Sequence, residues 1–162
     1  MFGIPAVSQR ASDYHWNQVF GRNGSTITRT SSLAFHTFAA QTIRFGAFPS
    51  VPTITNLGLA AYKRLQAVGT VSTDYSTSTA LLYTPQGTAS TTLISGTQVW
   101  LGGTAVTLAF PDFSAVSGWN NAWAPAAGGT AGWTYLSNFV NYTGPLCVEG
   151  AKLLSGLVTG VH

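Results

Sequence analysis

The stretch from residue 77 to residue 110 restricts the fold most. It holds short runs rich in Thr, Val, Leu, Ile and aromatic residues, and turn residues separate one run from the next. Runs of this kind at intervals of about 8–12 residues are typical of antiparallel sandwiches and barrels. The runs are TSTALLYTP (77–85), STTLIS (90–95), QVWL (98–101) and TAVTLAF (104–110). The sequence therefore predicts an all-β fold, an antiparallel, jelly-roll-like β-sandwich.

The run TAVTLAF also predicts which of its side chains are buried. Val106, Leu108 and Phe110 alternate with Ala105 and Thr107 along the run. Alternate residues of a strand point to opposite faces of the sheet, so the three larger side chains should share the core face.

Further elements are predicted on both sides of this stretch. Short β-prone runs predict strands at 25–30, 33–38, 41–48, 67–73 and 132–144. One or two short helices are expected as well, at 56–65 and from Tyr14 or His15 to Phe20. The first of these has Asn56 as an acceptable N-cap and a stripe of Leu57, Ala61 and Leu65.

The length of 162 residues favours a single domain with two distinct ends. Residues 1–24 lack a clean period and are interpreted as an N-terminal arm or anchoring segment. Residues 25–149 form the expected sandwich, and the apolar, Gly-broken residues 150–162 are interpreted as a C-terminal strand or arm. Cys147 lies between Leu146 and Val148 and is interpreted as a small buried hydrophobic residue.

Charge is scarce, and this bears on the partners of the protein. Charged residues make up 7% of the chain, against about 25% in an ordinary domain. Little repulsion then keeps copies apart, which favours packing against neighbours. The seven basic residues are spread along the chain, so nucleic acid is not an expected partner. No apolar run is long enough to predict a membrane span, and no secretory signal is recognised at the N-terminus, so the chain is expected to be made in a cytoplasm.

The titratable residues predict no catalytic site, no metal site and no cofactor. The inventory is short: Asp13, Asp74, Asp112, Glu149, His15, His36, His162 and Cys147. None of the histidines stands in a metal-binding spacing, and no nucleophile elbow or phosphate loop is present. The chain is therefore not expected to be an enzyme.

The segment PDFSAVSGWNNAWAPAAGGTAGW (111–133) is the candidate functional site. It holds Trp119, Trp123 and Trp133 among small and polar residues. Three interpretations stay open: the indoles fill the core, they contact another subunit, or they form an aromatic platform for a sugar. In the last case Trp119 and Trp123 would stack on the sugar while Asn121 and Asp112 bind its hydroxyl groups.

With its low charge and its β-prone runs rich in Thr, Ser and Gly, the chain resembles the accessory structural proteins of tailed bacteriophages. These include tail-tip, fibre-associated and capsid-decorating β-sandwiches. The residues that carry the resemblance are TDYSTSTALLYTPQGTASTTLISG (73–96) and LGGTAVTLAFPDFSAVSGW (101–119). The resemblance implies a homotrimer or larger ring, with host glycans as a further class of partner. It transfers no functional residue.

Together these observations predict a non-enzymatic structural component of a virus particle, made in the host cytoplasm. It would assemble with copies of itself and pack against other virion proteins. The alternative is a carbohydrate-binding module that uses the tryptophan-rich segment to recognise a host surface or a polysaccharide.

Overall fold

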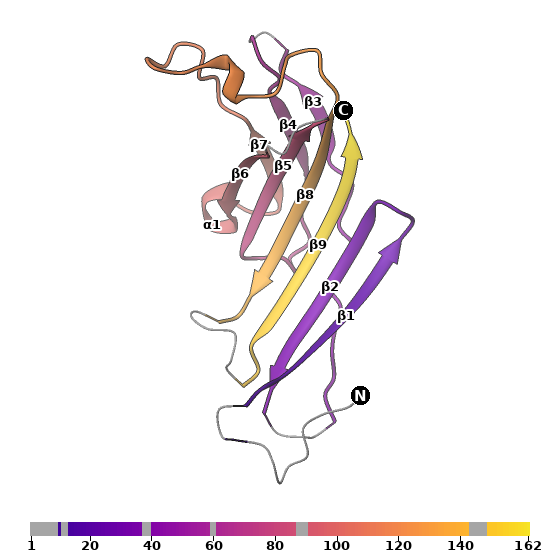
Figure 1. The fold of residues 1–162 in the computed structure, drawn as a ribbon. Coiled ribbons are helices and arrows are strands. Elements are labelled where there is room, and N and C mark those ends of the chain that lie inside the picture. The colour runs from indigo at the N-terminus through magenta and orange to yellow at the C-terminus, as the bar shows by residue number, and fades with distance from the viewer. Residues whose placement is uncertain (1–9, 11–12, 37–39, 59–60, 87–90, 143–148) are drawn as a thin grey trace.

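The protein folds into two antiparallel β-sheets that pack face to face (Figure 1). The computed structural model describes residues 10, 13–36, 40–58, 61–86, 91–142 and 149–162. The larger sheet has six strands in the order β1 (His15–Asn23), β2 (Ile27–Phe35), β9 (Lys152–Val161), β8 (Ala131–Val140), β5 (Ser78–Pro85) and β6 (Thr92–Thr97). The smaller sheet has three strands in the order β3 (Thr53–Asn56), β4 (Leu65–Thr70) and β7 (Ala105–Ala109). The predicted all-β class is confirmed.

The core lies between the two sheets and is rich in aromatic residues. The predicted core face of β7 is confirmed, because Val106 and Leu108 are each 1% exposed and Phe110 is 9% exposed. Side chains of the larger sheet meet them from the other side, among them Leu81, Tyr83, Trp133, Tyr135 and Val158. Alternation with period two therefore identified one wall of this core correctly.

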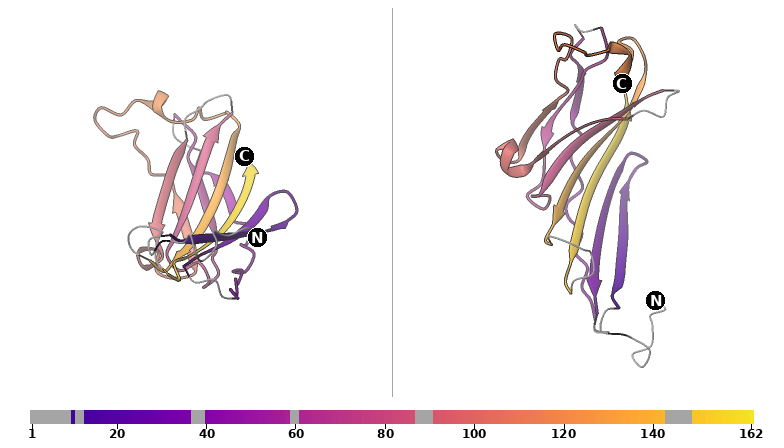
Figure 2. Two further views of the ribbon diagram at one scale, coloured as in Figure 1. Left: turned by 60° about the horizontal axis from the view of Figure 1, so that its bottom comes forward. Right: turned by 60° about the vertical axis from the view of Figure 1, so that its left-hand side comes forward.

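The two ends of the chain contribute strands to the larger sheet. Residues 15–23, within the expected N-terminal arm, form the edge strand β1. Residues 152–161 form β9, which is hydrogen-bonded to β2 on one side and to β8 on the other. Figure 2 shows the β1–β2 hairpin extending away from the smaller sheet. Cys147 lies outside the described residues.

The helix predicted from Tyr14 or His15 to Phe20 is wrong, because this segment belongs to β1. Its residues pair with β2 in register from His15 opposite Phe35 to Asn23 opposite Ile27. Gly24 has a φ of 65° in the turn of residues 24–26 that connects the two strands, a conformation that glycine adopts without steric cost. The strands predicted at 25–30 and 33–38 form a single strand, β2, through Phe35.

The helix predicted at 56–65 is also wrong, because this segment connects β3 to β4. Asn56 lies opposite Leu65 in the register, and the Leu57 amide donates to the Arg64 carbonyl at 2.8 Å. The Asn56 side chain accepts hydrogen bonds from the amides of Gly58 and Arg64 at 3.2 and 3.4 Å. Gly58 has a φ of 60°, which a right-handed helix does not accommodate.

The run QVWL, predicted as a strand, forms the short helix α1 (Gln98–Leu101). Thr97 caps its start by accepting a hydrogen bond from the Trp100 amide, and Gly102 ends it at a φ of 79°. A Thr N-cap and a left-handed Gly after the last turn are the usual limits of a helix. The second short helix of the described residues is the 3-10 helix η2 (Asn121–Trp123).

The strand predicted at 41–48 is absent, and this segment instead packs on the larger sheet through side-chain contacts. The Arg29 guanidinium lies over the rings of Phe45 and Phe48, at 4.6 and 4.0 Å from their centroids. It also donates to the Gly46 carbonyl at 2.9 Å, and the Ser31 hydroxyl donates to the Arg44 carbonyl at 2.7 Å. Side chains of β2 thus bind backbone carbonyls that a neighbouring strand would otherwise bind.

Three tyrosines of the core couple the stability of the fold to alkaline pH. Burial raises the pKa of Tyr75, Tyr83 and Tyr135 to about 12. An exposed tyrosine titrates near pH 10, so the unfolded chain releases these protons first. Their contribution to stability is therefore complete below about pH 10 and is lost progressively between about pH 10 and pH 12.

Tyr135→Phe separates burial from hydrogen bonding in this core. Among the described residues the Tyr135 hydroxyl has no hydrogen-bond partner, whereas the Tyr75 hydroxyl donates to the Ala47 carbonyl. Tyr135→Phe should therefore leave the free energy of unfolding at pH 7 unchanged or raise it by up to about 1 kcal/mol. It should also make stability fall less steeply between about pH 10 and pH 12.

Urea unfolding at pH 7 and at two alkaline pH values measures both effects. Tyr75→Phe is the matched control, because it removes a hydroxyl that does have a partner and should be destabilising at pH 7. A larger loss at pH 7 for Tyr135→Phe than for Tyr75→Phe would contradict this account of the two hydroxyl groups.

Candidate functional site

The three tryptophans of the segment 111–133 lie in three different environments. Trp133 is on β8 and is 9% exposed, within the core. Trp119 is partly buried and packs against the same core. Trp123 is 65% exposed. Filling the core therefore accounts for Trp133, accounts for part of Trp119, and does not account for Trp123.

A continuous series of aromatic rings joins Trp123 to the core. Phe110 meets Phe113 edge to face at a centroid distance of 5.6 Å, and Phe113 lies 4.9 Å from Trp119. Tyr62 also contacts Trp119, at 5.4 Å. Trp119 then meets Trp123 edge to face at a centroid distance of 5.7 Å, and this is an arrangement that aromatic pairs prefer. The exposed indole is thus supported from below by rings that are themselves packed on the core.

Polar contacts fix the short helix that carries Trp123. The Asn120 side chain caps η2 by accepting from the Ala122 amide at 3.0 Å. The Trp119 indole nitrogen donates to Oδ1 of Asn121 at 2.9 Å. Asn121 is therefore adjacent to the indoles, as predicted, and its side-chain oxygen is engaged by one of them.

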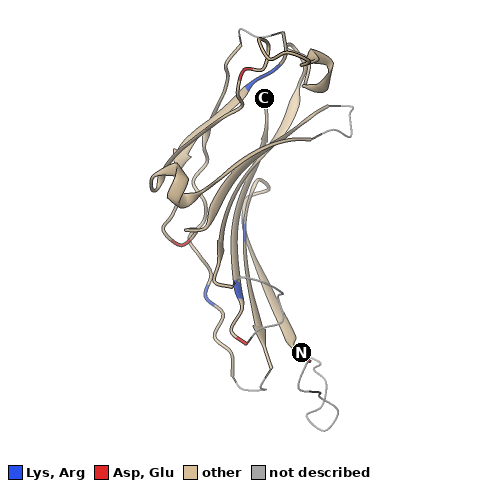
Figure 3. Cartoon of the chain, turned by 90° about the vertical axis from the view of Figure 1, so that its left-hand side faces the viewer, with Lys and Arg blue, Asp and Glu red and all other residues tan. Residues whose placement is uncertain are grey.

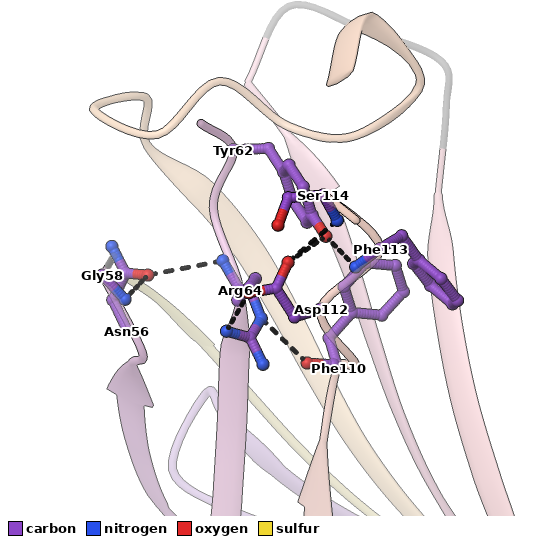
Figure 4. Close-up of polar contacts among 8 residues, drawn as sticks. All are labelled: Asn56, Gly58, Tyr62, Arg64, Phe110, Asp112, Phe113 and Ser114. Atoms are coloured by element: carbon purple, nitrogen blue, oxygen red, sulfur yellow. Dashed lines mark hydrogen bonds and ion pairs between the residues drawn. The ribbon is translucent and has the colours of Figure 1, made fainter. Parts of the chain in front are cut away.

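The fourth predicted site residue, Asp112, belongs to a separate hydrogen-bonded network (Figure 4). Its carboxylate accepts from the Ser114 amide at 2.9 Å and from the Tyr62 hydroxyl at 3.2 Å, and it pairs with Arg64 at 3.3 Å. The Arg64 Nε also donates to the Phe110 carbonyl at 3.2 Å. Hydrogen bonds from Ser114, together with the Arg64 charge, lower the pKa of Asp112. This carboxylate ties the start of the segment 111–133 to the residues that lead into β4.

Beside Trp123 the surface forms a hollow of about 230 Å³. Its described lining comes from the end of β5, the start of β6 and the segment that precedes β8, and none of it is charged. The polar side chains in the lining are Gln86, Thr92 and Thr130. Sequence analysis missed these three, because they lie at the ends of three different strands and form no local motif. Of the four predicted site residues, Trp123 is the one that lines this hollow.

A second candidate surface is the face of the larger sheet that points away from the smaller one, here called the outer face. It is turned toward the viewer in Figure 1, and no described segment crosses it. Residues directly opposite each other on antiparallel strands share a face of the sheet. The register of the six strands therefore shows which residues belong to the outer face. Its larger apolar residues include Trp16, Phe20, Leu93, Leu136, Leu153 and Leu157. Trp16, Phe20 and Leu93 are 41%, 64% and 57% exposed, and the other three are partly exposed.

The outer face carries almost no charge. Within the six strands, Arg22 is the charged side chain that the register places on it, opposite Thr28. The four acidic residues of the chain all lie outside the strands, and Figure 3 shows the few charged positions scattered along the ribbon. Between the apolar side chains the face presents Thr, Ser and Asn, such as Thr30, Ser155 and Asn138. A large, nearly uncharged face of this kind is a feature of interaction surfaces.

Two other searches of the described residues found no candidate. No group of three or more His, Cys, Asp and Glu residues in that part of the chain is placed to hold a metal ion. None of the helices formed by those residues has the length and apolar character that crossing a membrane requires.

Comparison with known proteins returned no match among family models, curated proteins or solved structures.

Proposed function

We propose that this protein is a non-enzymatic structural protein that assembles with copies of itself through the outer face of its larger sheet. We further propose that it belongs to the virus particle of a tailed bacteriophage. The observation that carries the first proposal is the outer face itself, with its exposed apolar residues and its near absence of charge. The second proposal, that the chain belongs to a virus particle, rests on the resemblance of its composition and β-prone runs to those of bacteriophage accessory proteins.

The size of the outer face fits a specific contact between two protein chains. Its longest strands have ten residues and the sheet has six strands. At about 3.3 Å per residue and about 4.8 Å between strands, such a face measures roughly 800 Å². A stable interface of standard size buries about 800 Å² on each partner. One copy of the outer face is therefore large enough to hold a second copy.

The composition of the outer face suits an identical partner in particular. In a symmetric contact each charge meets a copy of itself or of its neighbours, so a face whose charges share one sign repels its own copy. The outer face avoids this cost, because Arg22 lies near its edge, on β1. Apolar side chains such as Leu157 and Leu136, which are opposite each other on β9 and β8, would lose solvent contact on assembly.

A charge placed on the outer face tests the proposal. Leu157→Lys near the middle of the face and Phe20→Lys on its edge strand should both lower the mass of the assembly in sedimentation experiments. Phe20 is 64% exposed, so Phe20→Lys should leave the fold intact, and circular dichroism checks this. The reason for the loss is that each interface would then bury uncompensated like charges.

Val68→Lys is the matched control for the two outer-face variants. Val68 is 43% exposed on β4, in the smaller sheet, and should tolerate lysine without a change in mass. Loss of assembly in Val68→Lys with retention in both outer-face variants would refute the proposed surface.

A further inference from the structure

We propose that the hollow beside Trp123 binds one ring of a neutral oligosaccharide, with the indole as its stacking platform. This site is distinct from the outer face, so it does not depend on the proposed assembly. It would give the protein a ligand-binding activity in addition to a structural one.

The first support is the exposure of an indole that the structure holds in place. Trp123 is 65% exposed, yet its ring packs edge to face on Trp119, and η2 fixes its backbone. Exposing most of a tryptophan forgoes the large free-energy gain that burial of its apolar surface would give. A ring that is both rigid and exposed can bind a flat apolar surface with little loss of conformational entropy. The apolar faces of a pyranose ring are such a surface.

The second support is the chemistry of the hollow. Its polar side chains are one amide, Gln86, and two hydroxyl groups, Thr92 and Thr130. Amide and hydroxyl groups both donate and accept hydrogen bonds, and so do the hydroxyl groups of a sugar. The described lining offers no charge to a carboxylate, phosphate or ammonium group. A neutral sugar is therefore the ligand class that matches both the indole and its surroundings.

The size of the hollow sets the extent of the contact. Its volume of about 230 Å³ lies below the range of about 300–1,000 Å³ for pockets that enclose a drug-sized ligand. It would thus hold one ring of a longer chain and leave the neighbouring rings in solvent. Limited contact of this kind gives weak binding for one copy of the protein, which an assembly with several copies would strengthen.

The test is a titration of the full chain with cellohexaose, maltohexaose and N-acetylchitohexaose, followed by tryptophan fluorescence and calorimetry. Concentrations up to about 10 mM detect a dissociation constant of about 1 mM. At least one of these sugars should bind, and Trp123→Ala should weaken that binding at least tenfold. Trp123→Phe, which keeps a smaller ring, should retain part of the affinity, and Gln86→Ala should lower it severalfold.

Trp100→Ala is the matched control, because Trp100 is 74% exposed on α1 and lies outside the lining of the hollow. It should bind the sugar as the unaltered chain does. Failure of all three sugars to bind would overturn the inference, and so would binding that Trp100→Ala abolishes and Trp123→Ala leaves unchanged. Binding of the sugars that Trp123→Ala leaves unchanged would likewise overturn it. Binding of hexagalacturonate in preference to the neutral sugars would overturn the assignment of the ligand class.

Discussion

Trp133→Ala should lower the free energy of unfolding by about 3–5 kcal/mol. Trp133 is 9% exposed, and its indole lies against the backbone of β9 at Gly160, where a Cβ atom would collide with the ring. Its opposite neighbour on β5 is Tyr83, which is also a member of the core. Alanine would leave a cavity on the core face of β8 and β9, and the hydrogen bonds between these two strands prevent the backbone from moving to fill it.

Trp123→Ala provides the internal comparison, because it removes the same side chain from an exposed position in the same segment. Its cost should stay within about 1 kcal/mol. Urea unfolding of both variants, followed by circular dichroism, measures the difference. Equal losses for the two variants would mean that Trp123 is as deeply packed as Trp133, which would contradict the placement of the exposed indole.

Arg29→Ala should destabilise the protein by about 2–4 kcal/mol. The guanidinium lies over the rings of Phe45 and Phe48 and donates to the Gly46 carbonyl, so one side chain contacts the segment 40–52 at three of its residues. Arg29→Lys should recover only part of the loss, because an ammonium group does not stack as a planar guanidinium does.

The control for Arg29 is Arg22→Ala, on the neighbouring strand. Arg22 is exposed on the outer face and has no contact comparable to the two phenylalanine rings among those of the described residues. Its substitution should change stability by about 0.5 kcal/mol or less. The backbone amides of residues 43–48 should exchange their hydrogens faster in Arg29→Ala and at an unchanged rate in Arg22→Ala. Unchanged exchange in Arg29→Ala would contradict the role given to Arg29.

The fold class could be predicted from the sequence because the relevant pattern is local. The alternation in β7 and the turn residues around β5 and β6 report directly on strands that are half buried. The same local analysis misassigned residues 56–65, where the spacing of Leu57, Ala61 and Leu65 imitates a helical stripe. In the structure Leu65 begins β4, and the Asn56 side chain and Gly58 close a loop instead.

The arrangement of the strands could not be predicted, because long-range pairing leaves no local trace. Nothing in residues 152–161 indicates that they lie between β2 and β8, strands separated by about a hundred residues in sequence. The same limit applies to the candidate ligand site. Trp123 was identified by its residue type, whereas Gln86, Thr92 and Thr130 come together only once the strand ends are placed. Asp112 was selected as a polar neighbour in sequence, but its carboxylate binds Arg64, Tyr62 and Ser114.

The central claim, assembly through the outer face, is tested most directly by the mass of the unaltered chain in solution. Light scattering across a dilution series should give a mass of at least twice 17.0 kDa, in whole-number multiples, that persists as the protein is diluted. That result would show a closed oligomer, and the outer-face variants would then locate its interface. A mass of 17.0 kDa at every concentration would contradict the claim.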